Sequence, residues 1–247
     1  IDETADVETE ADWESTIPQN LTENWAENVV LIAQSQMGYQ ESRKNFRFAD
    51  DGTTRKGYTR YGAWYGNEYG DWCAMFAAFC IRYAGIPAEQ MPVNSGCAAW
   101  ISELKNAGMY VESQTKQPKS GDLVFFDLDQ DGSADHVGIV EKVQESGTLK
   151  VVEGNSADMV KENEWATEDA KILGYGLIPE NPLLQTQKEV KTEEKAAEEM
   201  AADAEEPEHT EDTVNTANTA NTDAPETESD ETSQAETPKE QRISMSE

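Results

Sequence analysis

The order of the apolar patterns along the chain constrains the fold more than any other feature of this sequence. Three segments with helical periodicity come first, and four short runs rich in β-branched and aromatic residues follow them. Helices followed by a run of strands are typical of an α+β domain in which an antiparallel sheet packs on the helices. The predicted helices span 23–40, 72–85 and 94–108, and the predicted strands are GDLVFFD, DHVGIVEKV, TLKVVEGNS and KILGYGLI.

The two ends of the chain are acidic and poor in residues that build a core. Residues 1–20 carry seven acidic residues and no Lys or Arg, and residues 186–247 carry 19 acidic residues against five basic ones. Such segments bury too little apolar surface to offset their conformational entropy. We therefore predict a disordered acidic segment over 1–20, one folded domain over 21–185, and a disordered low-complexity tail over 186–247.

The charge of the chain excludes several classes of partner. A formal net charge of −31 argues against nucleic acid and against anionic lipid, because both require a basic patch. No stretch reaches the roughly 18 apolar residues of a membrane span, so we expect no membrane insertion. The chain begins at Ile1 rather than Met, as a mature or trimmed chain would, and signal peptides are removed on export.

Two cysteines lie in the stretch YGDWCAMFAAFC, and they differ in position. Cys73 follows Gly-Asp-Trp at the predicted start of a helix, where the helix dipole lowers the pKa of a thiol. Cys80 lies in the middle of the same helix among apolar residues, where a thiol packs as a small hydrophobe. Taken alone, the position of Cys73 favours a packing role over a reactive one.

A histidine and two polar residues on the predicted strands supply partners for Cys73. His136 begins one strand, and the other histidine of the chain, His209, lies in the predicted tail. Glu153 and Asn155 are two residues apart on the next strand and therefore leave it on the same face. If the two strands pair across the ESG turn, that face lies beside His136. A structural histidine, an exposed Glu and a turn Asn are the alternative interpretation.

In this order and spacing, GDWCAMF, PKSGDLVFFD, DHVGIVEKV and VVEGN resemble the CHAP family of cysteine, histidine-dependent amidohydrolases/peptidases, which is related to NlpC-type and papain-like enzymes. The resemblance covers about residues 23–180 and neither acidic end. It implies a papain-like α+β fold in which the nucleophile at a helix N-terminus packs against an antiparallel sheet. It also implies hydrolysis of an amide bond in bacterial peptidoglycan, either the N-acetylmuramoyl-L-alanine amide or a bond of the stem or cross-bridge peptide.

The resemblance assigns a role to each matching residue. Cys73 is the nucleophile, His136 the general base and then acid, and Glu153 or Asn155 the residue that orients the histidine. Tyr61 and Trp72 are candidates for lining the substrate or the oxyanion region. Segment 41–71 is predicted as a long loop. Its aromatic residues and Trp72 either line a groove for glycan and stem peptide or anchor the loop to the core. The residues are Tyr58, Tyr61, Trp64, Tyr65, Tyr69 and Trp72.

Two further sites are predicted. The stretch DLDQDGSAD opens like a calcium loop, with Asp127, Asp129 and Asp131 as candidate ligands, but Gly138 stands where such a loop needs Glu. The pattern favours an ordinary Asp/Gly-rich turn over a calcium site, and we expect no cofactor to be required. Cys80 and Cys97 lie on neighbouring predicted helices, and a disulfide between them leaves Cys73 free in an oxidising, exported location. Two reduced thiols are the alternative.

The sequence thus predicts a secreted or cell-surface bacterial hydrolase whose partner is peptidoglycan, through its stem peptide and glycan. A cell-wall-binding or assembly module without turnover is one alternative, and a cysteine amidase acting on another substrate is a second.

Overall fold

The computed structural model describes residues 1–186, 190–192 and 195 of the chain. Nearly all of the predicted tail, 186–247, lies outside the described residues. Among the described residues, no helix is both long and apolar enough to cross a membrane.

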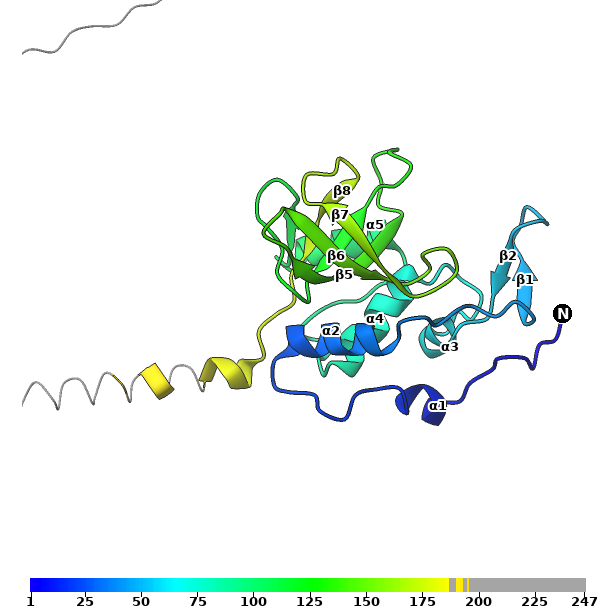
Figure 1. Cartoon of the computed structure of the whole chain (residues 1–247), viewed down its shortest axis with the longest axis horizontal. Coiled ribbons are helices and arrows are strands. Elements are labelled where there is room, and N and C mark those ends of the chain that lie inside the picture. Colours follow the sequence, from blue (N-terminus) through cyan, green and yellow to red (C-terminus); the bar gives the residue numbers. More distant parts are fainter. Residues whose placement is uncertain (187–189, 193–194, 196–247) are drawn as a thin grey trace, which may run out of the picture. The chain divides into compact units, whose positions relative to one another are not determined.

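The helices α1 to α5 lie within residues 1–180 (Figure 1), and residues 182–186 also have helical backbone. The three predicted helices correspond to α2, α4 and α5, each shorter at its ends than predicted. Asn24 caps the start of α2 by accepting a hydrogen bond from the Glu27 N–H at 3.3 Å. The bounds are α1 Glu10–Glu14, α2 Trp25–Ser35, α3 Arg60–Tyr65, α4 Cys73–Tyr83 and α5 Cys97–Asn106.

A six-stranded antiparallel sheet has the strand order β3-β8-β4-β5-β6-β7, and β1 and β2 form a separate hairpin. The four predicted strands correspond to β4, β5, β6 and β8. The sequence did not indicate β3, which is only three residues long, or β7, whose sequence KENEWA is half charged. The bounds are β1 Phe46–Phe48, β2 Arg55–Gly57, β3 Tyr110–Glu112, β4 Leu123–Phe126, β5 His136–Val143, β6 Thr148–Glu153, β7 Lys161–Ala166 and β8 Ile172–Gly176.

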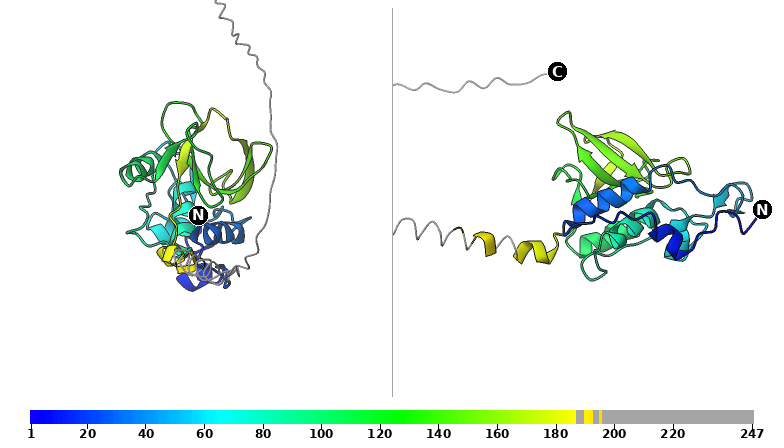
Figure 2. Two further views of the ribbon diagram at one scale, coloured as in Figure 1. Left: turned by 90° about the vertical axis from the view of Figure 1, so that its left-hand side faces the viewer. Right: turned by 60° about the horizontal axis from the view of Figure 1, so that its bottom comes forward.

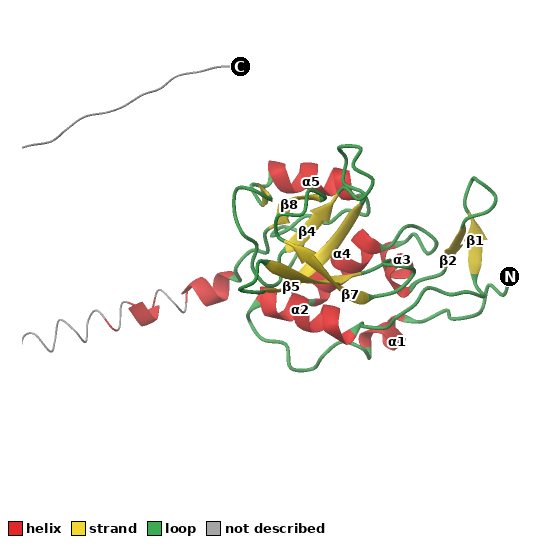
Figure 3. Ribbon diagram, turned by 45° about the horizontal axis from the view of Figure 1, so that its top comes forward, coloured by secondary structure: helices red, strands yellow, loops and turns green. Residues whose placement is uncertain are grey.

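The helices cover one face of this sheet, which confirms the predicted α+β class (Figures 2 and 3). Leu123, Phe125 and Val137 alternate along β4 and β5 toward a core shared with α2, α4 and α5. Every residue of α4 from Cys73 to Ile81 is buried, as its apolar sequence predicts. The intervening residues of the strands build a second cluster on the opposite face: Val124, Phe126, Val140, Leu149, Val151, Ile172 and Tyr175.

The segment 41–71 is not the long loop that the sequence predicts. It contains the β1–β2 hairpin and α3, and its strands and helix are each only three to six residues long. Elements this short leave no periodic pattern in a sequence, because a three-residue strand is shorter than two alternations.

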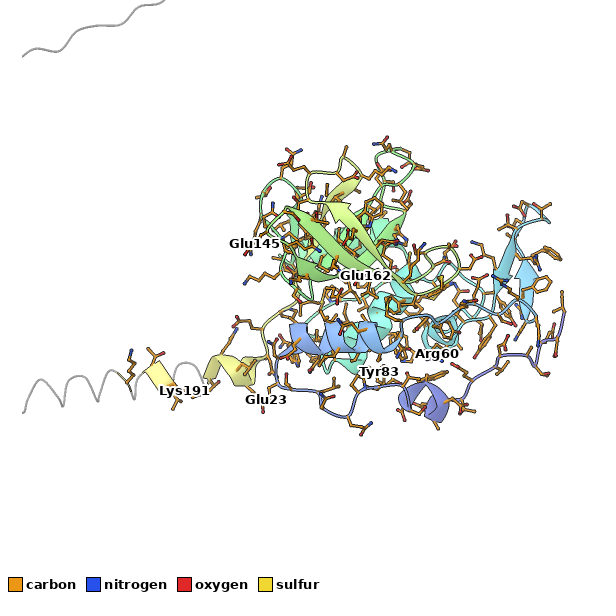
Figure 4. All side chains as sticks on the ribbon, viewed as in Figure 1. Glu23, Arg60, Tyr83, Glu145, Glu162 and Lys191 are labelled. Carbon is orange, nitrogen blue, oxygen red and sulfur yellow. The ribbon has the colours of Figure 1, made fainter. Side chains whose placement is uncertain are left out.

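Residues 1–20 are ordered, contrary to the prediction of a disordered acidic segment. Trp13 donates its indole N–H to the Tyr83 hydroxyl at 2.9 Å, and Trp13, Ile17 and Leu21 pack against the core. Glu8 accepts two hydrogen bonds of 2.6 Å from the Arg60 guanidinium. Figure 4 labels Arg60 and Tyr83, the partners of this segment. Average composition was misleading here because a few apolar side chains and one ion pair hold the segment.

We expect Arg60→Ala to lower the free energy of unfolding by about 2 to 4 kcal/mol, because the partly buried Glu8 carboxylate loses its partner. The guanidinium also bonds Gln36 Oε1 at 3.0 Å and lies over the Tyr39 ring at 4.4 Å. Urea unfolding monitored by tryptophan fluorescence measures the change. The exposed Arg55 is the control, for which Ala should cost less than about 0.5 kcal/mol. Equal losses for the two variants contradict the assignment.

Candidate active site

Cys73 is the first residue of α4 and lies where the helix presents backbone N–H groups without helical partners. The first hydrogen bond of the helix runs from the Phe76 N–H to the Trp72 carbonyl at 2.8 Å, so the N–H groups before Phe76 have no carbonyl within the helix. Cys73 is 5% exposed. A helix N-terminus stabilises a thiolate, and the same N–H groups are suited to bind an oxyanion.

His136 and Glu153 meet where β5 begins and β6 ends. The two strands are antiparallel with Gly138 opposite Glu153, which confirms the predicted pairing across the ESG turn. Glu153 Oε2 lies 2.9 Å from His136 Nε2. A Cβ atom on Gly138 would lie 2.4 Å from a methyl of Val151 and 2.9 Å from Glu153 Cγ. Only glycine therefore allows the carboxylate to lie this close to the strand that carries the histidine.

Cys73 and His136 form a coupled pair. Since Glu153 occupies Nε2 of the imidazole, Nδ1 is left for the sulfur. The pKa of the Cys73 thiol lies well below its ordinary value, and the largest cause is a hydrogen bond from Cys97. Burial raises this pKa. It is lowered further by the hydrogen bond and the charge of His136 and by the Val137 N–H. Burial lowers the pKa of His136, but its hydrogen bonds with Cys73 and Glu153 raise it to about 10. The favoured state at neutral pH is a thiolate beside an imidazolium.

Trp165 holds the second oxygen of Glu153. Its indole N–H donates to Glu153 Oε1 at 2.6 Å, so both carboxylate oxygens are engaged. The Trp165 ring also packs on Phe126 at 4.6 Å between centroids, and Phe126 in turn lies 5.9 Å from the His136 ring. Sequence reasoning missed Trp165 because β7 was not predicted. The available signal was a single aromatic residue within an otherwise charged run.

Asn155 lies at the same site but does not hold the histidine. It has a left-handed backbone with φ of 55° just after β6. It lines a cavity of about 400 Å³ together with His136, Glu153 and Trp165. In the structure the residue that contacts His136 is thus Glu153, and Asn155 is placed on the wall of the adjoining cavity. A larger cavity of about 630 Å³ beside β8 shares no residue with this site.

Tyr61 and Trp72 lie in the core and not on the surface of the site, contrary to their predicted roles. Both side chains are fully buried, and their rings stack at 5.4 Å. The Tyr61 hydroxyl donates to Gln36 Oε1 at 3.1 Å, and the Trp72 indole N–H donates to Glu41 Oε2 at 3.1 Å. These two members of the aromatic run therefore anchor the segment before α4, which leaves Cys73 in a fixed position.

All three cysteines are free, so the predicted disulfide between Cys80 and Cys97 is absent. Cys97 begins α5, and its sulfur lies 3.9 Å from the sulfur of Cys73. Cys80 is seven residues further along α4, a rise of about 10 Å, and it is fully buried. The prediction placed α5 beside the wrong part of α4, because the sequence does not show which turns of two helices face each other.

The acidic turn before His136 brings together Asp127, Asp129 and Asp135, whose carboxylate oxygens lie within 4.8 Å of one another. Asp135 thus takes the place predicted for Asp131. Asp127 accepts the N–H groups of Asp131 and Gly132 at 3.0 and 2.8 Å. Asp135 accepts the Leu128 N–H at 3.0 Å. Because backbone donors already occupy these carboxylates, the turn is closed without a cation, and calcium binding stays a prediction.

No curated protein gives a significant match to the chain. Among solved structures, it is similar to the crystal structure of Ly7917, with 15% identity, a TM-score of 0.41 and 62% of each chain covered. It is also similar to an NlpC/P60 family protein from Bacillus cereus ATCC 10987, with 16% identity, a TM-score of 0.37, and 64% of this chain and 40% of that chain covered.

A second structure of Ly7917, with the hydrolyzing product of MDP, gives 17% identity, a TM-score of 0.36, and coverage of 64% of this chain and 63% of that one. The chain thus spans 40 to 63% of the length of these proteins. The family model of the CHAP domain matches residues 64–155, a range that includes Cys73, His136, Glu153 and Asn155. Residues 64–155, the segment that holds the candidate site, therefore match the CHAP domain family.

Proposed function

We propose that this CHAP domain hydrolyses an amide bond of bacterial peptidoglycan through a thioester on Cys73. The arrangement of Cys73, His136 and Glu153 carries the proposal. It supplies a nucleophile, a proton carrier and an orienting carboxylate within direct reach of one another. The family to which residues 64–155 belong supports the wall as substrate.

The reaction follows from the charges of the site. The Cys73 thiolate attacks the scissile carbonyl carbon, and the free N–H groups at the start of α4 hold the negative charge that develops on the carbonyl oxygen. The His136 imidazolium then gives its proton to the leaving amine, and the C–N bond breaks. The neutral imidazole takes a proton from water, which attacks the thioester and releases the acid and the thiolate. Glu153 orients the ring and stabilises its charged form throughout.

Mass spectrometry of the muropeptides released from purified cell walls tests the substrate and identifies the bond. A new amino group on the first alanine of the stem indicates an N-acetylmuramoyl-L-alanine amidase, and a new amino group further along indicates an endopeptidase. We further propose that the protein acts outside the cell membrane, where this substrate lies. If no muropeptide is released while the Cys73 thiol remains reactive, the wall is not the substrate.

We expect Trp165→Phe to lower kcat on cell walls by about tenfold, because Glu153 loses the donor that fixes its second oxygen while the aromatic packing on Phe126 remains. Trp100→Phe is the matched control. Trp100 also donates its indole N–H, to the Pro92 carbonyl at 2.8 Å, but it lies in α5 within the core. It should lose stability with little change in kcat. Equal loss of kcat in both variants contradicts a positioning role for Trp165.

A further inference from the structure

Cys97 is a buried nucleophilic group that the proposed mechanism does not require for bond cleavage. Its sulfur lies 3.9 Å from the Cys73 sulfur, and each cysteine is the first residue of its helix. Cys97 is 7% exposed and Cys73 is 5% exposed, so a small molecule reaches them more readily than a protein thiol does. A thiolate with a second thiol beside it is the arrangement found where a reactive cysteine is oxidised reversibly.

We propose that Cys73 and Cys97 form a redox-sensitive dithiol, in which a hydroperoxide oxidises Cys73 and Cys97 then captures it as a disulfide. The inference goes beyond hydrolysis, since it concerns a modification of the nucleophile and not the substrate. It assigns Cys97 the role of a resolving cysteine, which the sequence-based prediction of a Cys80 partner had hidden.

The chemistry balances with a hydroperoxide as the oxidant. The Cys73 thiolate attacks the terminal oxygen, an S–O bond forms, the O–O bond breaks, and the alkoxide or hydroxide that leaves takes a proton from water. The Cys97 sulfur then attacks the sulfenic sulfur of Cys73, an S–S bond forms, and hydroxide leaves and becomes water with the thiol proton. The two sulfurs lose two electrons in total and the hydroperoxide gains them. A dithiol reductant reverses the oxidation.

The electrostatics favour this order of events. The hydrogen bond with Cys73, burial and the charge of Cys73 all raise the pKa of Cys97, so Cys97 stays protonated while Cys73 is a thiolate. Oxidation of Cys73 to sulfenic acid removes that negative charge. Cys97 then loses its proton more easily, at the moment when its partner has become electrophilic.

The two sulfurs already lie close to bonding distance. Closing the sulfurs from 3.9 Å to the roughly 2 Å of a disulfide requires a small movement of each side chain. A loop with a glycine precedes each cysteine, Gly70-Asp71-Trp72 before Cys73 and Ser95-Gly96 before Cys97. Once the bond forms, Cys73 carries no thiolate, and amide hydrolysis stops until the disulfide is reduced.

Peptide mapping of the full chain tests the proposal directly. Cleavage after Arg60, Arg82 and Lys105 puts Cys73 and Cys80 on one tryptic peptide and Cys97 on the next. The Cys80→Ala variant therefore makes the link unambiguous. After treatment with hydrogen peroxide and alkylation of the remaining thiols, we expect peptides 61–82 and 83–105 joined by a bond that dithiothreitol breaks. The Cys97→Ala variant should instead accumulate two or three oxygen atoms on Cys73.

Activity gives the second readout, with each protein compared to its own untreated sample. Peroxide should lower turnover by about tenfold or more in both variants, and dithiothreitol should restore it only where Cys97 is present. If the Cys80→Ala protein yields no joined peptide and its Cys73 is over-oxidised as fast as in Cys97→Ala, the proposal is wrong. Peptide mapping needs no substrate. If the peptides are joined but the protein does not degrade cell walls, the proposed function is wrong and the redox proposal stands.

Discussion

Cys73→Ala is expected to abolish the turnover of purified cell walls, with a fall of about 10⁴-fold or more. Among the described residues, the sulfur that this substitution removes is the one placed both at the start of α4 and beside the imidazole of His136. Once the Cys73 sulfur is gone, substrate binding and the oxyanion donors are what remains at the start of α4. Release of soluble amines or of muropeptides measures the effect, with circular dichroism to show that the fold is retained.

Cys80→Ala is the matched control for this experiment. It makes the same chemical change on the same helix, seven residues away, at a fully buried position whose thiol pKa is raised well above its ordinary value by burial. We expect a loss of stability of about 1 to 2 kcal/mol and nearly unchanged turnover. Comparable turnover by the wild type and Cys73→Ala removes Cys73 from the mechanism, whatever Cys80→Ala does.

The pairing of His136 with Glu153 was predictable because it is local. A hairpin turn fixes the register of the two strands it joins, so the ESG turn alone places Glu153 near the start of β5. The same reasoning left Glu153 and Asn155 as alternatives, because both leave β6 on one side and the sequence does not show where the strand ends. The structure ends β6 at Glu153, and Asn155 follows in a left-handed conformation.

Cys97 and Trp165 were not predictable as site residues, because tertiary packing brings each of them there. Cys97 lies beside Cys73 because of the position in which α5 packs on the core. The helical periodicity of residues 94–108 does not show which end of α4 the helix contacts. Trp165 contacts Glu153 from β7, a strand whose polar sequence does not predict a strand. Trp13 is a similar case, since the acidic composition of residues 1–20 concealed a side chain that bonds Tyr83. Sequence patterns thus indicated the residues that we propose carry the chemistry and missed those that contact them.

The pH dependence of Cys73 alkylation should distinguish a thiolate–imidazolium pair from an ordinary thiol. Cys73 has a lowered pKa and His136 a pKa raised to about 10, so the charged pair exists above the first and below the second. An ordinary thiol with a pKa of about 8.5 is less than about 1% thiolate at pH 6. We therefore expect iodoacetamide to modify wild-type Cys73 at nearly the same rate from pH 6 to 9, within about threefold.

His136→Gln removes the positive charge but keeps a polar side chain beside Glu153. Alkylation of Cys73 should then rise more steeply between pH 6 and 8 than in the wild type, because the thiol pKa moves back toward its ordinary value while the hydrogen bond from Cys97 remains. The Cys97→Ala variant should move in the same direction, since the hydrogen bond from Cys97 also lowers the pKa of Cys73. Hydrolysis by the wild type should decline as the pH rises through about 10, where His136 loses the proton that the leaving amine needs. An unchanged alkylation profile in His136→Gln would show that the imidazolium does not hold the thiolate, and the acid–base role of His136 would then have no support.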